Sequence, residues 1–362
     1  MKTRNAVALA AAGVGVGLAV AGLHRSTHPT EAKGPVSPDP GRRRTPPPDE
    51  LFDLPADVVH HRIDTPDGGT IHAIEKGEGR PLVLLHGITL RSDVWAPQFH
   101  QLTDRYRVIA VDLRGHGESA VGAEGLGIHR LAQDLSTLLG SLDLHDAVLV
   151  GHSMGGMTVM QFCGLHPEVL AARVAGLVFL ATASHESYGP LIDNTVRALV
   201  ARGQAVVESG RELPPPSKAG MRSVRLVFGD HPSKKAIGIV GEMATELPPA
   251  VAVPSFASIL EHDARDALRA THTPALVVVG TRDVLTPVWA GRTLARALPD
   301  AEFVVLPRAG HQLMQERPDE VAELIDAFVA RIEGTEPSVA AAVADDDGPL
   351  SADQVEPAGD RA

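Results

Sequence analysis

The sequence predicts an α/β fold in which a mostly parallel central sheet carries helices on both faces and an inserted helical cap. Short apolar runs recur along the chain without the polar alternation of a half-exposed strand, and helical patterns separate most of them. Near-continuous apolar strands that alternate with helices are typical of a parallel sheet buried on both faces. The alternation is interrupted once, between about residues 184 and 270.

The expected elements begin with an antiparallel hairpin that turns at residues 67–69, with the sequence DGG. The buried strands expected after it cover residues 81–86, 107–112, 147–151, 174–180, 275–280 and 303–306. The clearest helical patterns cover residues 128–142 and 318–332. Sites in such sheets form at the carboxyl ends of the strands, so the residues just after each apolar run are the first candidates for a site.

The interrupted segment, residues 184–270, shows no clear buried strand. It holds prolines at 214–216 and 248–249, with helical pieces between them. We expect it to form a helical cap over the carboxyl ends of the strands. Its apolar residues favour a small-molecule substrate that is uncharged and hydrophobic.

The first 23 residues have the composition of a targeting segment. Lys2 and Arg4 precede an uncharged run over residues 5–23 that is rich in alanine, valine and glycine. The length of this run fits a signal-peptide core or a single membrane helix. Small residues at 19–21 favour cleavage and export, whereas basic residues on both sides leave the orientation open. We expect a membrane-anchored or exported protein of the cell envelope rather than a cytoplasmic one; the alternative is an unstructured alanine-rich leader.

The other flanking segments are also distinct in composition. Residues 24–50 are polar and rich in proline, which is typical of an extended linker. Residues 334–362 carry acidic side chains against a single arginine, and we expect a disordered acidic tail. The folded domain should therefore span residues 51–333.

Charge and cysteine content exclude several classes of protein. The 33 basic and 45 acidic side chains give a formal net charge of −12, which argues against a nucleic-acid partner because phosphate binding needs a basic face. The single cysteine, Cys163, forms no intramolecular disulfide and falls in a predicted buried helix, where packing is its expected role. No cysteine and histidine residues have the spacing of a structural zinc site. The sequence implies no metal and no organic cofactor.

The strongest chemical motif is GHSMG at residues 151–155, between an apolar run and a helical pattern. In this strand–turn–helix context the G-x-S-x-G pattern places the serine on a sharp turn, with its hydroxyl exposed at a helix N-terminus. The flanking glycines permit close approach of the backbone. Ser153 is therefore the predicted nucleophile.

A serine hydroxyl needs a base to take its proton, and that base needs an orienting acid. His311 follows the run 303–306 and precedes a helical pattern, so it is the predicted base. Asp283 follows the run 275–280 and is the predicted acid. Three aspartates within the expected cap fit the acid role less well: Asp230, Asp263 and Asp266.

Acyl transfer at a serine also needs donors for the developing oxyanion. The backbone N–H of Met154, directly after the nucleophile, is one predicted donor. The sequence HG at residues 86–87 follows the first parallel strand, and we expect the backbone N–H of Ile88 to be the second.

Together these motifs resemble the α/β-hydrolase superfamily. They are HG at 86–87, DLRGHGES at 112–119, GHSMGG at 151–156, GTRDVLTP at 280–287 and AGHQLMQERP at 309–318. The resemblance covers residues 81–331 and implies a serine, acid, histidine order along the chain, which this sequence has. Dehalogenases and epoxide hydrolases of the superfamily use an aspartate nucleophile, and the serine at 153 argues against both. Residues 112–119 are expected to be architectural.

The resemblance implies a cofactor-independent serine hydrolase that cleaves a carboxylic ester through an acyl-Ser153 intermediate. Carbon–carbon bond hydrolysis and cofactor-free haloperoxidase or perhydrolase chemistry use the same triad and are alternatives. An acyltransferase and a non-catalytic binding protein on this fold are further alternatives. The cap and the pocket decide among them, and the motifs do not.

Overall fold

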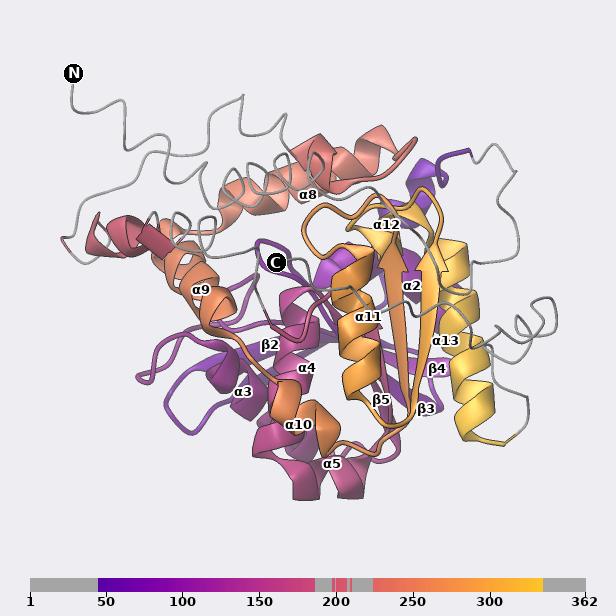
Figure 1. Ribbon diagram of the computed structural model, residues 1–362, viewed down its shortest axis with the longest axis horizontal. Coiled ribbons are helices and arrows are strands. Elements are labelled where there is room, and N and C mark those ends of the chain that lie inside the picture. Colours follow the sequence, from indigo (N-terminus) through magenta and orange to yellow (C-terminus); the bar gives the residue numbers. More distant parts are fainter. Residues whose placement is uncertain (1–44, 186–196, 199, 207–208, 210–223, 335–362) are drawn as a thin grey trace, which may run out of the picture.

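An eight-stranded sheet lies at the centre of the molecule (Figure 1). The computed structural model describes residues 45–185, 197–198, 200–206, 209 and 224–334. The strands lie in the order β1-β2-β4-β3-β5-β6-β7-β8. Their bounds are β1 Val59–Asp64, β2 Thr70–Lys76, β3 Arg80–Leu85, β4 Tyr106–Asp112, β5 Ala147–His152, β6 Val174–Leu180, β7 Ala275–Gly280 and β8 Ala301–Leu306.

The pairing of the strands confirms the predicted fold class. β1 and β2 form the antiparallel hairpin, and β2 pairs antiparallel with β4. From β4 to β8 every neighbouring pair is parallel. Because these strands are parallel, their carboxyl ends lie at the same edge of the sheet. The loops after β3, β4, β5, β7 and β8 therefore all lie at that edge.

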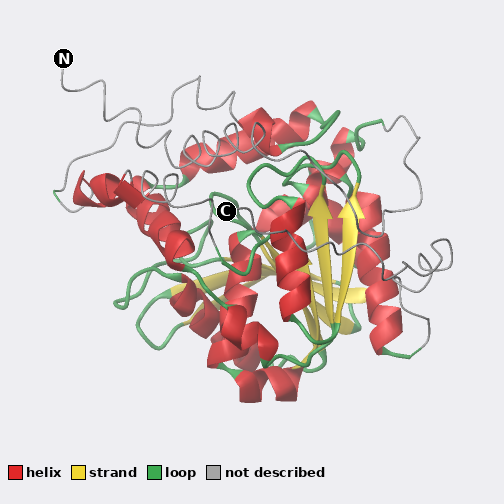
Figure 2. Cartoon of the chain, in the orientation of Figure 1, coloured by secondary structure: helices red, strands yellow, loops and turns green. Residues whose placement is uncertain are grey.

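Helices cover both faces of the sheet, as Figure 2 shows. Alternate residues of each strand point to opposite faces. In β3, Leu82 and Leu84 therefore join one apolar cluster and Val83 and Leu85 the other. Because both faces are buried, the strands carry no polar alternation, and this is why their sequences are continuous apolar runs.

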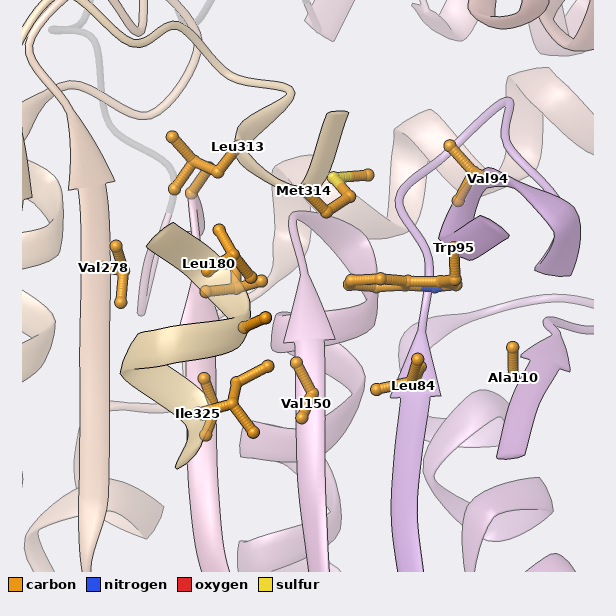
Figure 3. Packing of buried hydrophobic residues seen from close by; sticks show 14 of the residues in the cluster. Leu84, Val94, Trp95, Ala110, Val150, Leu180, Val278, Leu313, Met314 and Ile325 are labelled. Atoms are coloured by element: carbon orange, nitrogen blue, oxygen red, sulfur yellow. The ribbon is translucent and has the colours of Figure 1, made fainter. Parts of the chain in front are cut away.

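The first face packs against α2 (Ala96–Leu102) and α13 (Pro318–Ile332). Trp95, just before α2, lies over this face near Leu84, and Ile325 of α13 lies near Val150 (Figure 3). The second face packs against α3 (Ile128–Ser141), α4 (Met154–Leu165) and α11 (Val288–Ala297). Complete burial of one such side chain contributes about 1.5–3 kcal/mol.

The described part of the segment between β6 and β7 is mainly helical. It holds a 3-10 helix, η3 (Val224–Val227), followed by α8 (Lys234–Glu246), α9 (Pro249–Glu261) and α10 (Arg265–Arg269). In Figure 1, α8 lies beyond the arrowheads of the parallel strands, where a cap is expected, whereas α10 returns beside α4. Residues 186–196 and 210–223 lie outside the described part of this segment.

The predicted leader, the predicted tail after Gly334 and most of the predicted linker lie outside the described residues. The limits of the folded domain, the leader and the cellular location therefore stay predictions. Among the helices of the described ranges, no single one is long and apolar enough to cross a membrane. α8 and α9 meet that test only together, and they are bent by 103° relative to each other.

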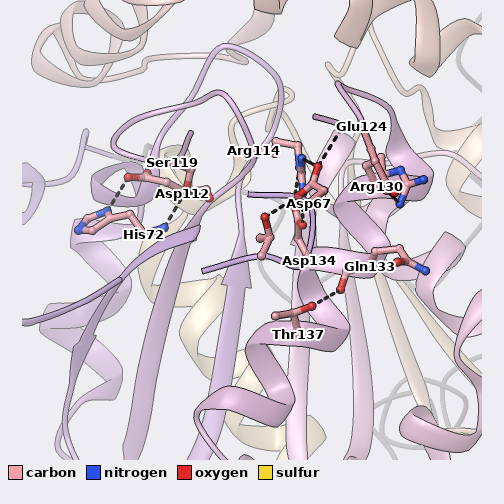
Figure 4. Close-up of polar contacts among 11 residues, drawn as sticks. Asp67, His72, Asp112, Arg114, Ser119, Glu124, Arg130, Gln133, Asp134 and Thr137 are labelled. Atoms are coloured by element: carbon pink, nitrogen blue, oxygen red, sulfur yellow. Dashed lines mark hydrogen bonds and ion pairs between the residues drawn. The ribbon is translucent and has the colours of Figure 1, made fainter. Parts of the chain in front are cut away.

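A buried ion-pair network joins three parts of the fold (Figure 4). Arg114, in the loop after β4, donates to Asp67 in the hairpin turn at 2.6 Å and to Asp134 on α3 at 2.7 Å. These three side chains are 10% exposed or less. The hydrogen bonds from Arg114 hold the pKa of Asp67 well below its usual range. The predicted architectural role of residues 112–119 agrees with this network.

Replacing Arg114 by leucine should leave two buried carboxylates without their counter-charge. Breaking a buried ion pair from one side costs about 3–5 kcal/mol. We expect a loss of this size in the free energy of unfolding, measured by urea denaturation. The control is Arg269→Leu, which removes an exposed ion pair with Asp266 and should cost less than about 1 kcal/mol. Equal losses in the two variants would contradict this assignment.

Candidate active site

Ser153 lies at the junction of β5 and α4 in a strained backbone conformation. Its φ is 52° and its ψ is −118°, a region that residues with a Cβ atom rarely adopt. Two flanking glycines make the turn possible. A Cβ on Gly151 would lie 2.5 Å from the Cα of Gly156, and one on Gly155 would collide with the Leu85 carbonyl oxygen. The predicted strand–turn–helix geometry is thus present at the motif.

The loops after β7 and β8 bring the predicted acid and base together. His311 Nδ1 lies 2.9 Å from Asp283 Oδ2, and both side chains are buried. With Nδ1 donating to the carboxylate, Nε2 is the nitrogen left to take a proton. Asp283 Oδ1 in turn accepts the N–H groups of Leu285 and Thr286 at 2.8 and 2.9 Å. These bonds fix the carboxylate that orients the imidazole.

A second histidine ties the serine turn to the His311 loop. His152, the residue before Ser153, donates from Nε2 to the backbone oxygen of His311 at 2.9 Å, and the two rings lie 4.9 Å apart. Burial lowers the pKa of His152 well below its usual range, so its ring is neutral. Among the residues that the structure describes, no hydrogen bond joins the Ser153 hydroxyl to the His311 ring. The direct serine–histidine contact stays a prediction.

Both predicted oxyanion donors border Ser153. Met154 is the first residue of α4, and Gly87, which precedes Ile88, is so close that an added Cβ would lie 3.0 Å from the Ser153 Cβ. Neither the Ile88 nor the Met154 N–H donates to an acceptor within the described part of the chain. These two N–H groups are therefore available to a ligand oxygen.

His86 orients the backbone N–H of Ile88, the second predicted oxyanion donor. Its Nδ1 donates to the Gly87 carbonyl oxygen at 2.7 Å, and its Nε2 accepts the N–H of Leu113 at 3.0 Å. The Gly87 carbonyl and the Ile88 N–H belong to one planar trans peptide and point in opposite directions. Holding the carbonyl therefore sets the direction of the N–H. Burial lowers the pKa of His86, which favours the neutral ring, and the two hydrogen bonds select its tautomer.

Glu316 is a site residue that sequence reasoning missed. It ends the short helix α12 (Leu313–Glu316) and is buried beneath the His311 loop. Its carboxylate accepts the N–H groups of Gly229 at 2.7 Å, Gly310 at 3.0 Å and Gln312 at 3.2 Å. Two of these donors flank His311. The motif at 309–318 contains this glutamate, but its spacing gives no sign of a role.

The three cap aspartates that fit the acid role less well contact arginines instead. Asp230 pairs with Arg308 at 2.8 Å, and Asp263 pairs with Arg265. Asp266 pairs with an arginine one turn further along α10. Within the described residues, Asp283 is the carboxylate that contacts the His311 ring.

Three further side chains near these elements are part of the core. Trp95 is completely buried over the first face of the sheet (Figure 3). The Met154 side chain is also buried, in the apolar cluster on the second face of the sheet. Cys163 is buried in α4, and burial raises the pKa of its thiol to about 12, in agreement with a packing role.

Comparisons with known proteins agree with this architecture. The model of the alpha/beta hydrolase family matches residues 82–324. A thermophilic esterase from Thermogutta terrifontis superposes with a TM-score of 0.65 at 28% identity, over 76% of this chain and 99% of the esterase. A non-heme chloroperoxidase from Kitasatospora aureofaciens is 29% identical over 68% of this chain and 90% of its own.

A third relative is longer than the matched region. The dihydrolipoyllysine-residue acetyltransferase component of an acetoin cleaving system from Pseudomonas putida is 32% identical over 257 residues. The match covers 70% of this chain and 64% of that protein. From the family match and the sheet topology, the chain belongs to the alpha/beta hydrolase family, and its relatives include esterases.

The charge on Glu316 should make stability depend on pH in a defined direction. Folding raises the pKa of this carboxyl from 4.5 to about 6, because burial disfavours the charged form and the N–H donors only partly oppose this. Such a group stabilises the fold below its unfolded pKa, and the contribution is lost as the pH rises through 6. Relative to Glu316→Gln, the free energy of unfolding of the wild type should therefore fall by about 2 kcal/mol between pH 4 and pH 8.

Chemical denaturation at several pH values measures this difference. The matched control is Glu323→Gln, which changes an exposed glutamate on α13 and should follow the wild-type pH dependence. If the free energies of unfolding of wild type and Glu316→Gln differ by the same amount at every pH, the assignment is contradicted.

Proposed function

We propose that this protein hydrolyses a carboxylic ester through a covalent acyl-Ser153 intermediate. The observation that carries the proposal is the buried contact of 2.9 Å between His311 Nδ1 and Asp283 Oδ2 beside a strained Ser153. A paired and buried imidazole–carboxylate next to a serine at a helix N-terminus is the arrangement that nucleophilic acyl transfer requires.

Acylation begins when the Ser153 hydroxyl oxygen attacks the ester carbonyl carbon. His311 Nε2 takes the hydroxyl proton, and Asp283 stabilises the resulting imidazolium. The carbonyl oxygen becomes an oxyanion that accepts the N–H groups of Ile88 and Met154. When the carbon–oxygen bond to the leaving group breaks, His311 returns the proton to the departing alcohol, and the acyl group stays on Ser153.

Deacylation repeats these steps with water as the nucleophile. His311 Nε2 takes a proton from the water molecule, whose oxygen attacks the acyl carbon. The same two N–H groups stabilise the second oxyanion. Collapse of this intermediate releases the carboxylic acid, and the proton returns from His311 to the Ser153 oxygen. Each step uses side chains and backbone groups of this chain.

Perhydrolysis is a second candidate because a non-heme chloroperoxidase is among the relatives. Hydrogen peroxide would replace water in deacylation and give a peroxy acid from the same acyl-Ser153. The two activities share every residue named above. They are distinguished by the product formed when peroxide competes with water. The cap favours an uncharged, hydrophobic acyl substrate in either case.

Ser153→Ala should abolish ester hydrolysis and leave the fold intact. Alanine removes the hydroxyl oxygen that attacks the ester carbonyl and keeps the backbone of the turn. Hydrolysis of p-nitrophenyl esters from acetate to palmitate measures the loss, and circular dichroism checks the fold. A chain-length optimum that depends on Ser153 would establish an esterase. Near-wild-type turnover by the alanine variant would exclude this serine as the nucleophile.

Asp283→Asn should reduce kcat by orders of magnitude, about 10⁴-fold by analogy with the best-studied serine triad. Asparagine can present its N–H₂ group to His311 Nδ1, which favours the wrong tautomer of the imidazole. Asp230→Asn is the matched control, because Asp230 lies in an ion pair with Arg308 instead, and this variant should keep wild-type kcat. Full activity in Asp283→Asn would place the acid elsewhere.

A further inference from the structure

Three possible metal ligands meet on the outer hairpin, away from the serine turn. His60 lies on β1, His72 on β2 and Glu118 in the loop after β4. One ligand atom from each lies within 4.8 Å of the other two. His72 is buried, whereas the other two are exposed, so the cluster opens to solvent.

The strand register places the two imidazoles on one face of the sheet. Arg62 pairs directly with His72, so His60, two residues earlier, is the diagonal neighbour of His72. His60 Nδ1 lies 3.0 Å from His72 Nε2. Two nitrogen ligands of a tetrahedral zinc ion, each at about 2.0–2.1 Å, lie roughly 3.3 Å apart. Small side-chain rotations therefore suffice to direct both nitrogens at one ion.

The buried Asp112 carboxylate holds two of the three possible ligands, His72 and Glu118, in place. Its Oδ2 accepts the Nδ1–H of His72 at 2.7 Å and the backbone N–H of Glu118 at 3.0 Å. The first bond leaves the lone pair on His72 Nε2, the atom that faces His60. A carboxylate that orients a histidine in this way is the usual outer support of a protein metal site.

Ser119 fixes the loop against the strand (Figure 4). Its hydroxyl accepts the backbone N–H of His72 at 2.8 Å and donates to the backbone oxygen of Asp112 at 2.6 Å. Gly117, with a φ of 51°, lets the loop fold over the Asp112 carboxylate, which a Cβ there would strike. The position of Glu118 relative to His72 is therefore set by the fold.

We propose that His60 Nδ1, His72 Nε2 and the Glu118 carboxylate bind one divalent transition-metal ion of the Zn²⁺ class. Two imidazoles and one carboxylate suit such an ion, whereas Mg²⁺ and Ca²⁺ prefer oxygen ligands. Water completes the coordination from the open side. Asp112 and Glu118 provide the negative charge that offsets Arg62, the cation opposite His72.

Asp112, which orients His72, also connects the proposed metal site to the loops that border the predicted oxyanion donors. Asp112 Oδ1 accepts the N–H of Ser92 at 2.6 Å, and the next residue, Leu113, donates to His86. Zinc binding should therefore stabilise the folded chain without taking part in the chemistry at Ser153. The fold brings residues 60, 72 and 118 together, and their spacing along the sequence does not reveal this juxtaposition.

Isothermal titration of Zn²⁺ into the untagged, EDTA-treated and desalted full chain tests the proposal. We expect one ion per chain, and His60→Ala and Glu118→Gln should each weaken binding at least about 10-fold. His145→Ala is the matched control: it removes an exposed histidine that pairs with Asp143, and should bind zinc as the wild type does. Titration with Co²⁺ should give the visible absorption of a tetrahedral site in wild type and lose it in His60→Ala.

Thermal melts give an independent readout. Zn²⁺ should raise the Tm of wild type and His145→Ala, because it binds the native state, and should leave the Tm of His60→Ala unchanged. Circular dichroism of the two ligand variants without metal checks that they fold. No stoichiometric binding, or binding that survives both ligand substitutions unchanged, would overturn the proposal. Ester hydrolysis is not needed for this test, so its outcome is separate from that of the proposed function.

Discussion

The strained turn at Ser153 is the constraint on which the arrangement of the site depends. A residue held at a φ of 52° and a ψ of −118° costs about 1–3 kcal/mol, which the surrounding structure must offset. The Ser153 N–H donates to the Leu180 carbonyl at 3.1 Å, and the Ser153 carbonyl accepts the Thr182 hydroxyl at 2.8 Å. A Cβ on Gly156 would crowd Thr182. The end of β6 therefore fixes the turn at the end of β5.

Three buried carboxylates fix loops at the ends of other strands in a similar way. Asp112 ends β4, Asp283 follows β7, and Glu316 lies under the loop that follows β8. Each accepts backbone N–H groups of a loop that borders the site. A buried carboxylate is costly unless it is hydrogen-bonded, so these loops are ordered by the same bonds that make the buried charges tolerable. Two of these carboxylates position His311: Asp283 accepts a hydrogen bond from its ring, and Glu316 accepts the N–H groups of the two residues beside it, Gly310 and Gln312.

The parts of this structure that could be predicted from sequence are those encoded locally. Both faces of the sheet are buried, so each parallel strand is a continuous apolar run. Glycine is required at 151 and 155 by backbone contact, so the serine turn carries a recognisable motif. Glu316 accepts backbone N–H groups from its own motif and from Gly229 in the segment between β6 and β7, and no side-chain pattern marks such donors. The pairing of His60 with His72 depends on the exact register of the β1–β2 hairpin, which the residue types of the two strands do not fix.

We propose that Ser153, His311 and Asp283 act together as one catalytic triad. Labelling with a fluorophosphonate, followed by intact-mass measurement and peptide mapping, tests it without knowledge of the substrate. The account predicts one adduct per chain on Ser153, formed at a rate that falls by orders of magnitude in His311→Ala and Asp283→Asn. An adduct on another residue, or labelling of Ser153 at an unchanged rate in both variants, would contradict it.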